Sequence, residues 1–165
     1  MDWEAFGSIA ELVGAIAVIA SLLYVGRQVR ESSRATKGQT YDSISNRLNE
    51  AGAQTVNDPD LMDICLRATS GEPVSATELP RYTGFVHNLF RILESAYHQH
   101  ELGLIEEDKL KPLFHSTSVY IASEHGQKMW ETRRHLHDAK FQKFVDSLIQ
   151  STDVEAITKG FGIDH

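Results

Sequence analysis

A chain of 165 residues, of which 41% are hydrophobic and 24% are charged, has room for one domain with its own core and is not an intrinsically disordered chain. Its formal net charge of −7 argues against a nucleic acid as partner, because binding phosphates requires a basic surface. The single cysteine, Cys65, cannot form an internal disulfide, and its apolar neighbours predict a small buried side chain.

The first strong feature is an apolar segment from residue 9 to residue 26, IAELVGAIAVIASLLYVG, which contains one charge, Glu11. As a helix it rises about 27 Å, close to the thickness of the hydrocarbon layer of a bilayer. Its aliphatic residues cover every side of the helix, whereas a surface helix of a soluble protein has one apolar stripe. Trp3 and Tyr24 flank the segment, as is typical of the two headgroup regions. We therefore predict a transmembrane anchor over residues 1–27.

Basic residues follow the apolar segment directly and indicate its orientation. Residues 1–26 contain no lysine or arginine, and then Arg27, Arg30, Arg34 and Lys37 occur within about three turns. Because lysine and arginine collect on the cytoplasmic side, we expect the N-terminus outside the cell membrane and the rest of the chain in the cytoplasm. Residues 28–40 are polar on every side and predict a stalk beside the lipid headgroups.

Two other interpretations of this segment remain open. A cleaved signal peptide would need a basic N-terminal region, whereas this one is acidic. A central helix of a soluble bundle would also be apolar on all sides. Glu11 costs free energy in a bilayer, but it lies near the N-terminal end, where its carboxylate can reach the headgroups.

Small residues recur along the anchor at spacings of four, three and four: Ala10, Gly14, Ala17 and Ser21. Such a stripe lets helices approach closely in lipid, so it predicts self-association through this side. Glu11 adjoins the stripe. A ring of glutamates in an oligomer would then form a polar membrane site or a pore.

The next elements predict a helical bundle over residues 41–150. Tyr41, Ile44, Leu48 and Ala51 recur at helical spacing, and this helix should end near Val56. Asp58-Pro59 reads as an N-cap followed by proline at the first helical position, and Ser70-Gly71 should stop this second helix.

The following helix should open at the capping box Ser75-x-x-Glu78 and end at Gly103. Pro80 is either tolerated there or delays the start by one turn. Its apolar side contains the following residues: Tyr82, Phe85, Val86, Leu89, Phe90, Leu93 and Tyr97.

The last third of the chain predicts shorter helices. The acidic residues Glu106 to Asp108 suit a helix N-terminus, and Pro112 kinks or splits the helix that follows. Another helix contains Met129 and Trp130. Asp138 should cap the last regular helix, and residues 153–160 would add a turn or two in a tail of residues 151–165. No strand pattern competes, so the predicted fold is all-α, with an anchor and about five to six further helices.

The chain resembles a class of short bacterial membrane-anchored proteins of uncharacterised function. The resemblance lies in ELVGAIAVIASLLYVGRQVR, FRILESAYHQHELGLI, MWETRRHL and FQKFVDSLI, and it spans the chain to about Ile149. It implies the N-terminal anchor and the helical cytoplasmic domain, and it implies no catalytic residue.

Motifs for the common chemistries are absent from the sequence, which contains no HExxH, CxxC, P-loop, GxGxxG or GxSxG pattern. The pairs His98/His100 and His135/His137 are spaced by two residues, so on a helix each pair points to nearly opposite sides and does not chelate one ion. We therefore predict no cofactor and no metal site among these pairs.

A polar stripe marks the middle helix, where His87, Arg91, Glu94 and His98 share one side. An ion pair between Arg91 and Glu94, joined by Arg133 or Arg134, would fix how two helices pack. The same residues (Arg91, Glu94, His98, Arg133 and Arg134) would alternatively bind an anion or small ligand. A metal held together with Glu131 and His135 is a third, weaker interpretation, because bundle metal sites use more carboxylates.

These observations favour a single-pass membrane protein whose cytoplasmic helical bundle is an interaction or assembly module, with the lipid bilayer and a second copy of the chain as expected partners. A homo-oligomeric pore or transport accessory and a small-ligand or metal sensor are the alternatives. An enzyme is disfavoured, because nothing pairs a nucleophile with a base.

Overall fold

The computed structural model describes the backbone of residues 3–153, and within that range it is all-α. Seven α-helices and one short 3-10 helix occur there, and no strand is found between residues 3 and 153. The predicted fold class is therefore confirmed. The elements are α1 (Trp3–Asn57), α2 (Pro59–Thr69), α3 (Leu79–Glu101), α4 (Glu107–His115), α5 (Ser118–Ala122), α6 (Glu124–Arg133), η1 (Arg134–Leu136) and α7 (Ala139–Ser151).

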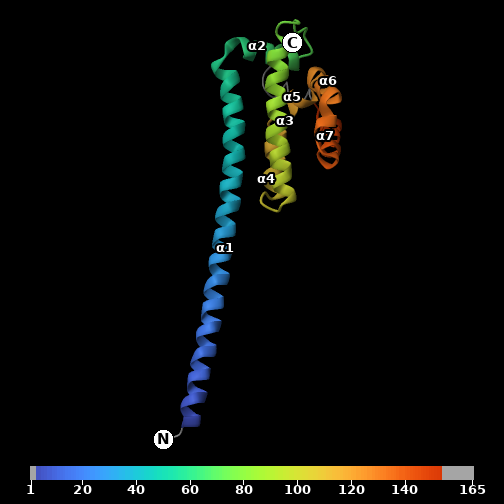
Figure 1. Cartoon of the computed structure of the whole chain (residues 1–165). Coiled ribbons are helices and arrows are strands. Elements are labelled where there is room, and N and C mark those ends of the chain that lie inside the picture. Colours follow the sequence, from blue (N-terminus) through green and yellow to red (C-terminus); the bar gives the residue numbers. More distant parts are fainter. Residues whose placement is uncertain (1–2, 154–165) are drawn as a thin grey trace. The chain divides into compact units, whose positions relative to one another are not determined.

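The helix α1 is continuous from the apolar segment into the bundle (Figure 1). No proline precedes Pro59, so nothing in the sequence removes a backbone hydrogen bond along its length. Contacts divide the chain into two compact units, Met1–Gln39 and Thr40–His165. The predicted boundaries at residues 27, 40 and 150 stay predictions.

Capping hydrogen bonds and proline residues determine where α2 and α3 begin. Asp58 accepts a hydrogen bond from Leu61 N at 3.1 Å, and Pro59 occupies the first helical position. The capping box forms as predicted: Ser75 Oγ accepts from Glu78 N at 3.3 Å, while Glu78 Oε2 accepts from Ser75 N at 2.9 Å. Pro80 delays the regular helix, so α3 begins at Leu79.

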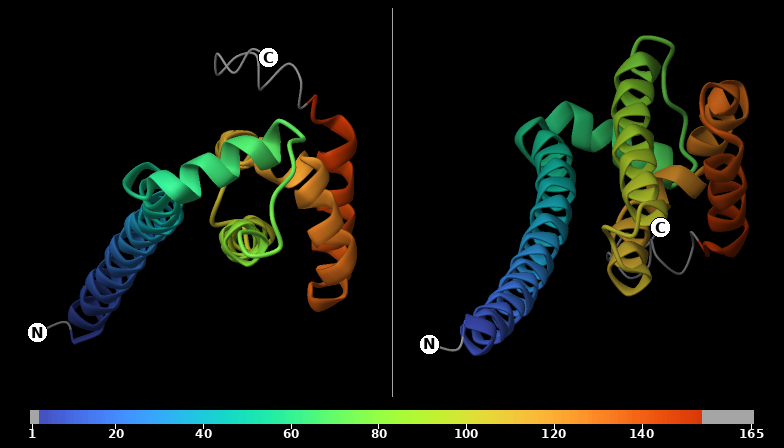
Figure 2. Two further views of the ribbon diagram at one scale, coloured as in Figure 1. Left: turned by 90° about the horizontal axis from the view of Figure 1, so that it is seen from above. Right: turned by 60° about the horizontal axis from the view of Figure 1, so that its bottom comes forward.

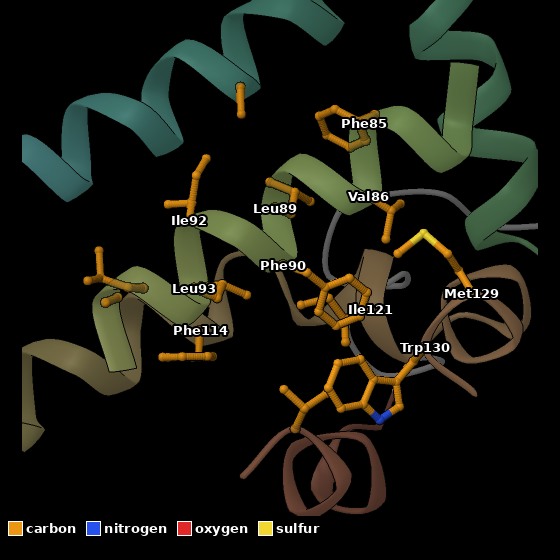
Figure 3. Close-up of a cluster of buried hydrophobic side chains, with 14 of the residues drawn as sticks. Phe85, Val86, Leu89, Phe90, Ile92, Leu93, Phe114, Ile121, Met129 and Trp130 are labelled. Atoms are coloured by element: carbon orange, nitrogen blue, oxygen red, sulfur yellow. The ribbon is translucent and has the colours of Figure 1, made fainter. Parts of the chain in front are cut away.

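The core of the second unit is built around α3 (Figure 3). Leu93, Phe90 and Val86 are completely buried, and Phe90 stacks on Trp130 of α6 with ring centroids 5.0 Å apart. The short helix α2 runs crosswise over α3 and α6 (Figure 2). From α1, Ile44 and Ala51 enter the same core. Trp130 is thus a packing residue, and Cys65 is buried as predicted.

The segment after Pro112 is split into short helices. Pro112 lies inside α4, and the chain then breaks twice, at Ser116 and at Ser123. Ser123 caps α6 by accepting from Gly126 N at 3.2 Å. Gly126 lies so close to the preceding helix that a Cβ there would stand 2.1 Å from the carbonyl oxygen of Tyr120.

The last helix, α7, begins as its sequence predicts. Asp138 accepts hydrogen bonds from Lys140 N and Phe141 N, at 2.9 and 3.0 Å. Phe141 and Val145 are then completely buried, which fixes α7 to the core. The further turns predicted over residues 153–160 lie, from residue 154 on, outside the described residues.

Candidate functional site

The apolar part of α1 exposes its side chains. Leu22 and Leu23 are 67% and 68% exposed, and the 18-residue window that defines the segment has a mean hydropathy of 1.8 with none of it buried. Length and composition therefore make α1 the one helix among the described residues that is able to cross a membrane. A core helix of a soluble protein would pass the same test of length and composition, but most of it would be buried.

The small-residue stripe and Glu11 lie on this exposed part of α1. A Cβ added at Gly14 would meet nothing within 4 Å, and Ala17 and Ser21 are exposed. Ala10 belongs to the helix, but its side chain is outside the described residues. The stripe is thus available on the surface of one chain, and self-association through it stays a prediction.

The basic residues after the apolar segment are arranged around α1. Arg27 pairs with Glu31 at 2.9 Å, and Arg30 Nε donates to the carbonyl oxygen of Gly26 at 3.2 Å. Arg27, Arg30 and Arg34 are exposed, so all three can contact anionic headgroups.

The polar stripe on α3 forms a network with His137, which lies between η1 and α7. Arg91 Nη1 donates to Glu94 Oε2 at 2.9 Å, and the other oxygen of Glu94 lies 2.9 Å from His137 Nδ1. The carboxylate approaches away from the N–H direction, so the second contact is a close polar contact and not an aligned hydrogen bond. The network is half-buried: the side chain of Glu94 is 20% exposed and that of His137 only 2%.

Aromatic rings enclose His137. The ring centroids of Trp130, Phe141 and Phe90 lie 5.3, 5.4 and 6.3 Å from the imidazole centroid. The burial of His137 was not predicted from the sequence; the one local signal is its position just before the N-cap Asp138, where an apolar residue commonly packs against the first turn of a helix.

His87 lies one turn before Arg91 on α3 and is affected by the charges of Arg91 and Arg133. Partial burial lowers the pKa of His87, and the nearby charges of Arg133, His137 and Arg91 lower it further, against an opposing effect of Glu94. Its Nδ1 is buried and makes no hydrogen bond to the part of the chain that the structure describes.

The two arginines predicted to join the stripe have different surroundings. Arg134 Nη2 pairs with Asp146 Oδ2 at 2.6 Å, and Trp130 Nε1 donates to the other oxygen of Asp146 at 2.9 Å. Arg133 is half-buried and lies near enough to affect His87. His98 is exposed. The structure thus pairs Arg91 directly with Glu94, places His137 against the other oxygen of Glu94, and puts Arg134 in a separate pair. Ligand binding by the five predicted residues stays a prediction.

Within residues 3–153, no three side chains of His, Cys, Asp or Glu lie close enough together to hold a metal ion. His135 and Glu131, the second predicted pair, are both exposed.

A small polar cavity lies on the outer side of Arg91. It has a volume of about 520 Å³ and is lined from α1 by Arg47, Glu50, Ala51 and Gln54, and from α3 by Asn88, Arg91, Ile92 and Ser95. Arg91 therefore connects the His137 network with a cavity that a small polar molecule can enter.

A larger cleft of about 1040 Å³ lies between the end of α3, α4 and α7, and we call it the α4–α7 groove. Its floor is apolar and contains Tyr97, Leu110, Phe114, Phe144 and Leu148. Four acidic residues also line it, Glu101, Glu107, Asp108 and Asp153; Lys140 pairs with Glu101, and Lys111 pairs with Glu107 at 2.9 Å. The sequence did not reveal this groove, because α7 is distant in the chain from α3 and α4.

Comparisons of the chain with protein-family models, curated proteins and solved structures find no match.

Proposed function

We propose that this protein is a single-pass membrane protein that holds a helical interaction module at the cytoplasmic surface. The observation that supports the proposal is the exposure of the aliphatic side chains of α1 next to a cluster of basic residues. Eight of these side chains are at least half exposed: Leu12, Val13, Ile16, Val18, Ile19, Leu22, Leu23 and Val25.

The free energy of insertion favours lipid modestly. Each aliphatic residue contributes about −0.3 to −0.6 kcal/mol near the centre of a spanning helix, and together they offset the roughly 2.5–3.5 kcal/mol that a central acidic residue costs. Glu11 costs less than this, because it lies near one end of the segment. The same residues exposed to water would form an apolar surface that soluble proteins rarely present.

The orientation follows from the charges. Arg27, Arg30, Arg34 and Lys37 flank the C-terminal end of the segment, and no basic residue precedes it. The bundle is then cytoplasmic, and it follows the anchor along the same helix, α1. Assembly would occur through the stripe of Gly14, Ala17 and Ser21, where close approach of helices gives packing energy in lipid.

Protease accessibility tests this arrangement. A protease added outside intact bacterial cells that express the full chain should leave the bundle uncut, and the same protease added to inverted membrane vesicles should digest it. Replacing Arg27, Arg30, Arg34 and Lys37 together by glutamine should produce a mixture of orientations, whereas Arg47→Gln within the bundle should not. Cleavage from the outside in intact cells would refute the proposed topology.

A further inference from the structure

We propose that the α4–α7 groove is the docking site of the chain's own C-terminal segment, residues 154–165. This inference concerns the bundle alone and does not depend on the membrane anchor.

The floor of the groove continues the hydrophobic core and is only partly covered. Phe144 contacts Tyr97 and Phe114, with ring centroids 4.9 and 4.5 Å apart, so the aromatic cluster continues from the core into the floor of the groove. Yet Tyr97, Phe144 and Leu148 are only partly buried. A segment that covers them would remove apolar surface from water, which is the main source of docking energy.

The C-terminal segment starts at the wall of this groove. α7 ends at Ser151, and the next two residues, Thr152 and Asp153, line the groove themselves. Thr152 has extended backbone angles, φ −90° and ψ 117°, and its Oγ1 donates to the carbonyl oxygen of Leu148 at 2.7 Å. The chain therefore turns out of the α7 helix beside the apolar floor.

The sequence of the segment suits the groove. Val154, Ile157 and Phe161 recur at spacings of three and four, which puts them on one side of a helix. Thr152 and Glu155 have the spacing of a capping box, and Thr152 already has the extended backbone of an N-cap.

Connection to α7 favours this occupant over any other. A segment that begins at the groove wall docks as an intramolecular ligand, with an effective concentration of the order of millimolar, and closing so short a loop costs little entropy. A second copy or another protein must compete with that concentration.

The reactivity of a cysteine placed in the groove tests the proposal. Ser147 lines the groove and is exposed, so Ser147→Cys is a small change at its edge. The natural Cys65 is buried and its pKa is raised to about 12 by burial, so it has almost no thiolate to react with N-ethylmaleimide at neutral pH. The rate is measured on the full chain in a solution of non-denaturing detergent, with the natural C-terminal segment and with the double substitution Ile157→Asp and Phe161→Asp.

The proposal predicts that the double substitution accelerates alkylation of Ser147→Cys by about tenfold, because a docked segment covers the lining of the groove and lowers access to the thiol. The control is Ser43→Cys, an exposed position on α1 that does not line the groove, whose rate should not change. Equal rates at Ser147→Cys with either segment would overturn the proposal. A similar acceleration at Ser43→Cys would also overturn it. Protection that disappears on dilution would assign the groove to a second copy and contradict the intramolecular docking.

Discussion

At the scale of single residues, the half-buried polar network is the feature that local sequence signals describe least well. The pair of Arg91 and Glu94 is a direct consequence of their spacing, since residues three apart on a helix are neighbours. His137 joins them from a distant part of the chain because η1 and α7 pack against α3. The spacing of residues within α3 contains no information on this contact.

His87 makes the stability of the bundle depend on pH. Its folded-state pKa lies below the ordinary 6.5, because burial and the neighbouring charges, above all that of Arg133, disfavour its protonation. Below pH 6.5 the unfolded chain therefore binds this proton more readily, and stability is lost as the pH falls.

We expect the thermal midpoint of the full chain in detergent to be lower at pH 5.5 than at pH 7.5. His87→Gln should show a smaller difference, because it removes a proton that the unfolded state binds more readily than the folded state. His98→Gln, a change at an exposed histidine of the same helix, is the matched control. The same loss of stability in the wild type and in His87→Gln would show that His87 does not contribute.

At the scale of elements, most helix ends are predictable from local chemistry, and the short helices are not. The caps Asp58 and Asp138 and the box of Ser75 and Glu78 form the hydrogen bonds that their sequence implies. The break between α5 and α6 lies at Ser123, and it brings Gly126 close to the backbone of Tyr120, a contact that no periodicity reveals.

Two glycines make a matched test of this close approach. Gly126→Ala should destabilise the bundle by about 1–3 kcal/mol, because its Cβ meets backbone carbonyls that cannot rotate away. Gly84→Ala, in the exposed side of α3 with nothing within 4 Å, should stabilise it by about 0.5–1 kcal/mol through helix propensity. Chemical denaturation of both variants measures the two effects. Equal changes of the same sign would contradict the close packing of α5 and α6.

At the scale of the whole molecule, the fold class follows from the sequence, and the surfaces that matter for function do not. Helical periodicity and the absence of strand patterns predicted an all-α chain, and the structure confirms it. The α4–α7 groove and the cavity beside Arg91 are each lined by residues from two or more helices, so they become visible only when those helices are packed.

The central claim at this scale is that the exposed aliphatic surface of α1 lies in a lipid bilayer. Its length, composition and lack of burial within the chain are all compatible with lipid as its surroundings. A charge introduced within the apolar segment should therefore weaken membrane association far more than the same charge introduced just outside it.

The most direct measurement is the partition of the full chain between membrane and supernatant after high-speed sedimentation of lysed cells without detergent. The wild type should sediment with the membranes and resist extraction at alkaline pH. The double substitution Ile16→Lys and Ile19→Lys should release the protein into the supernatant, since each lysine costs about 2.5–3.5 kcal/mol near the centre of a spanning helix. Val29→Lys, equally exposed but beyond Gly26, should leave it in the membrane. Wild-type protein that stays in the supernatant would contradict the account.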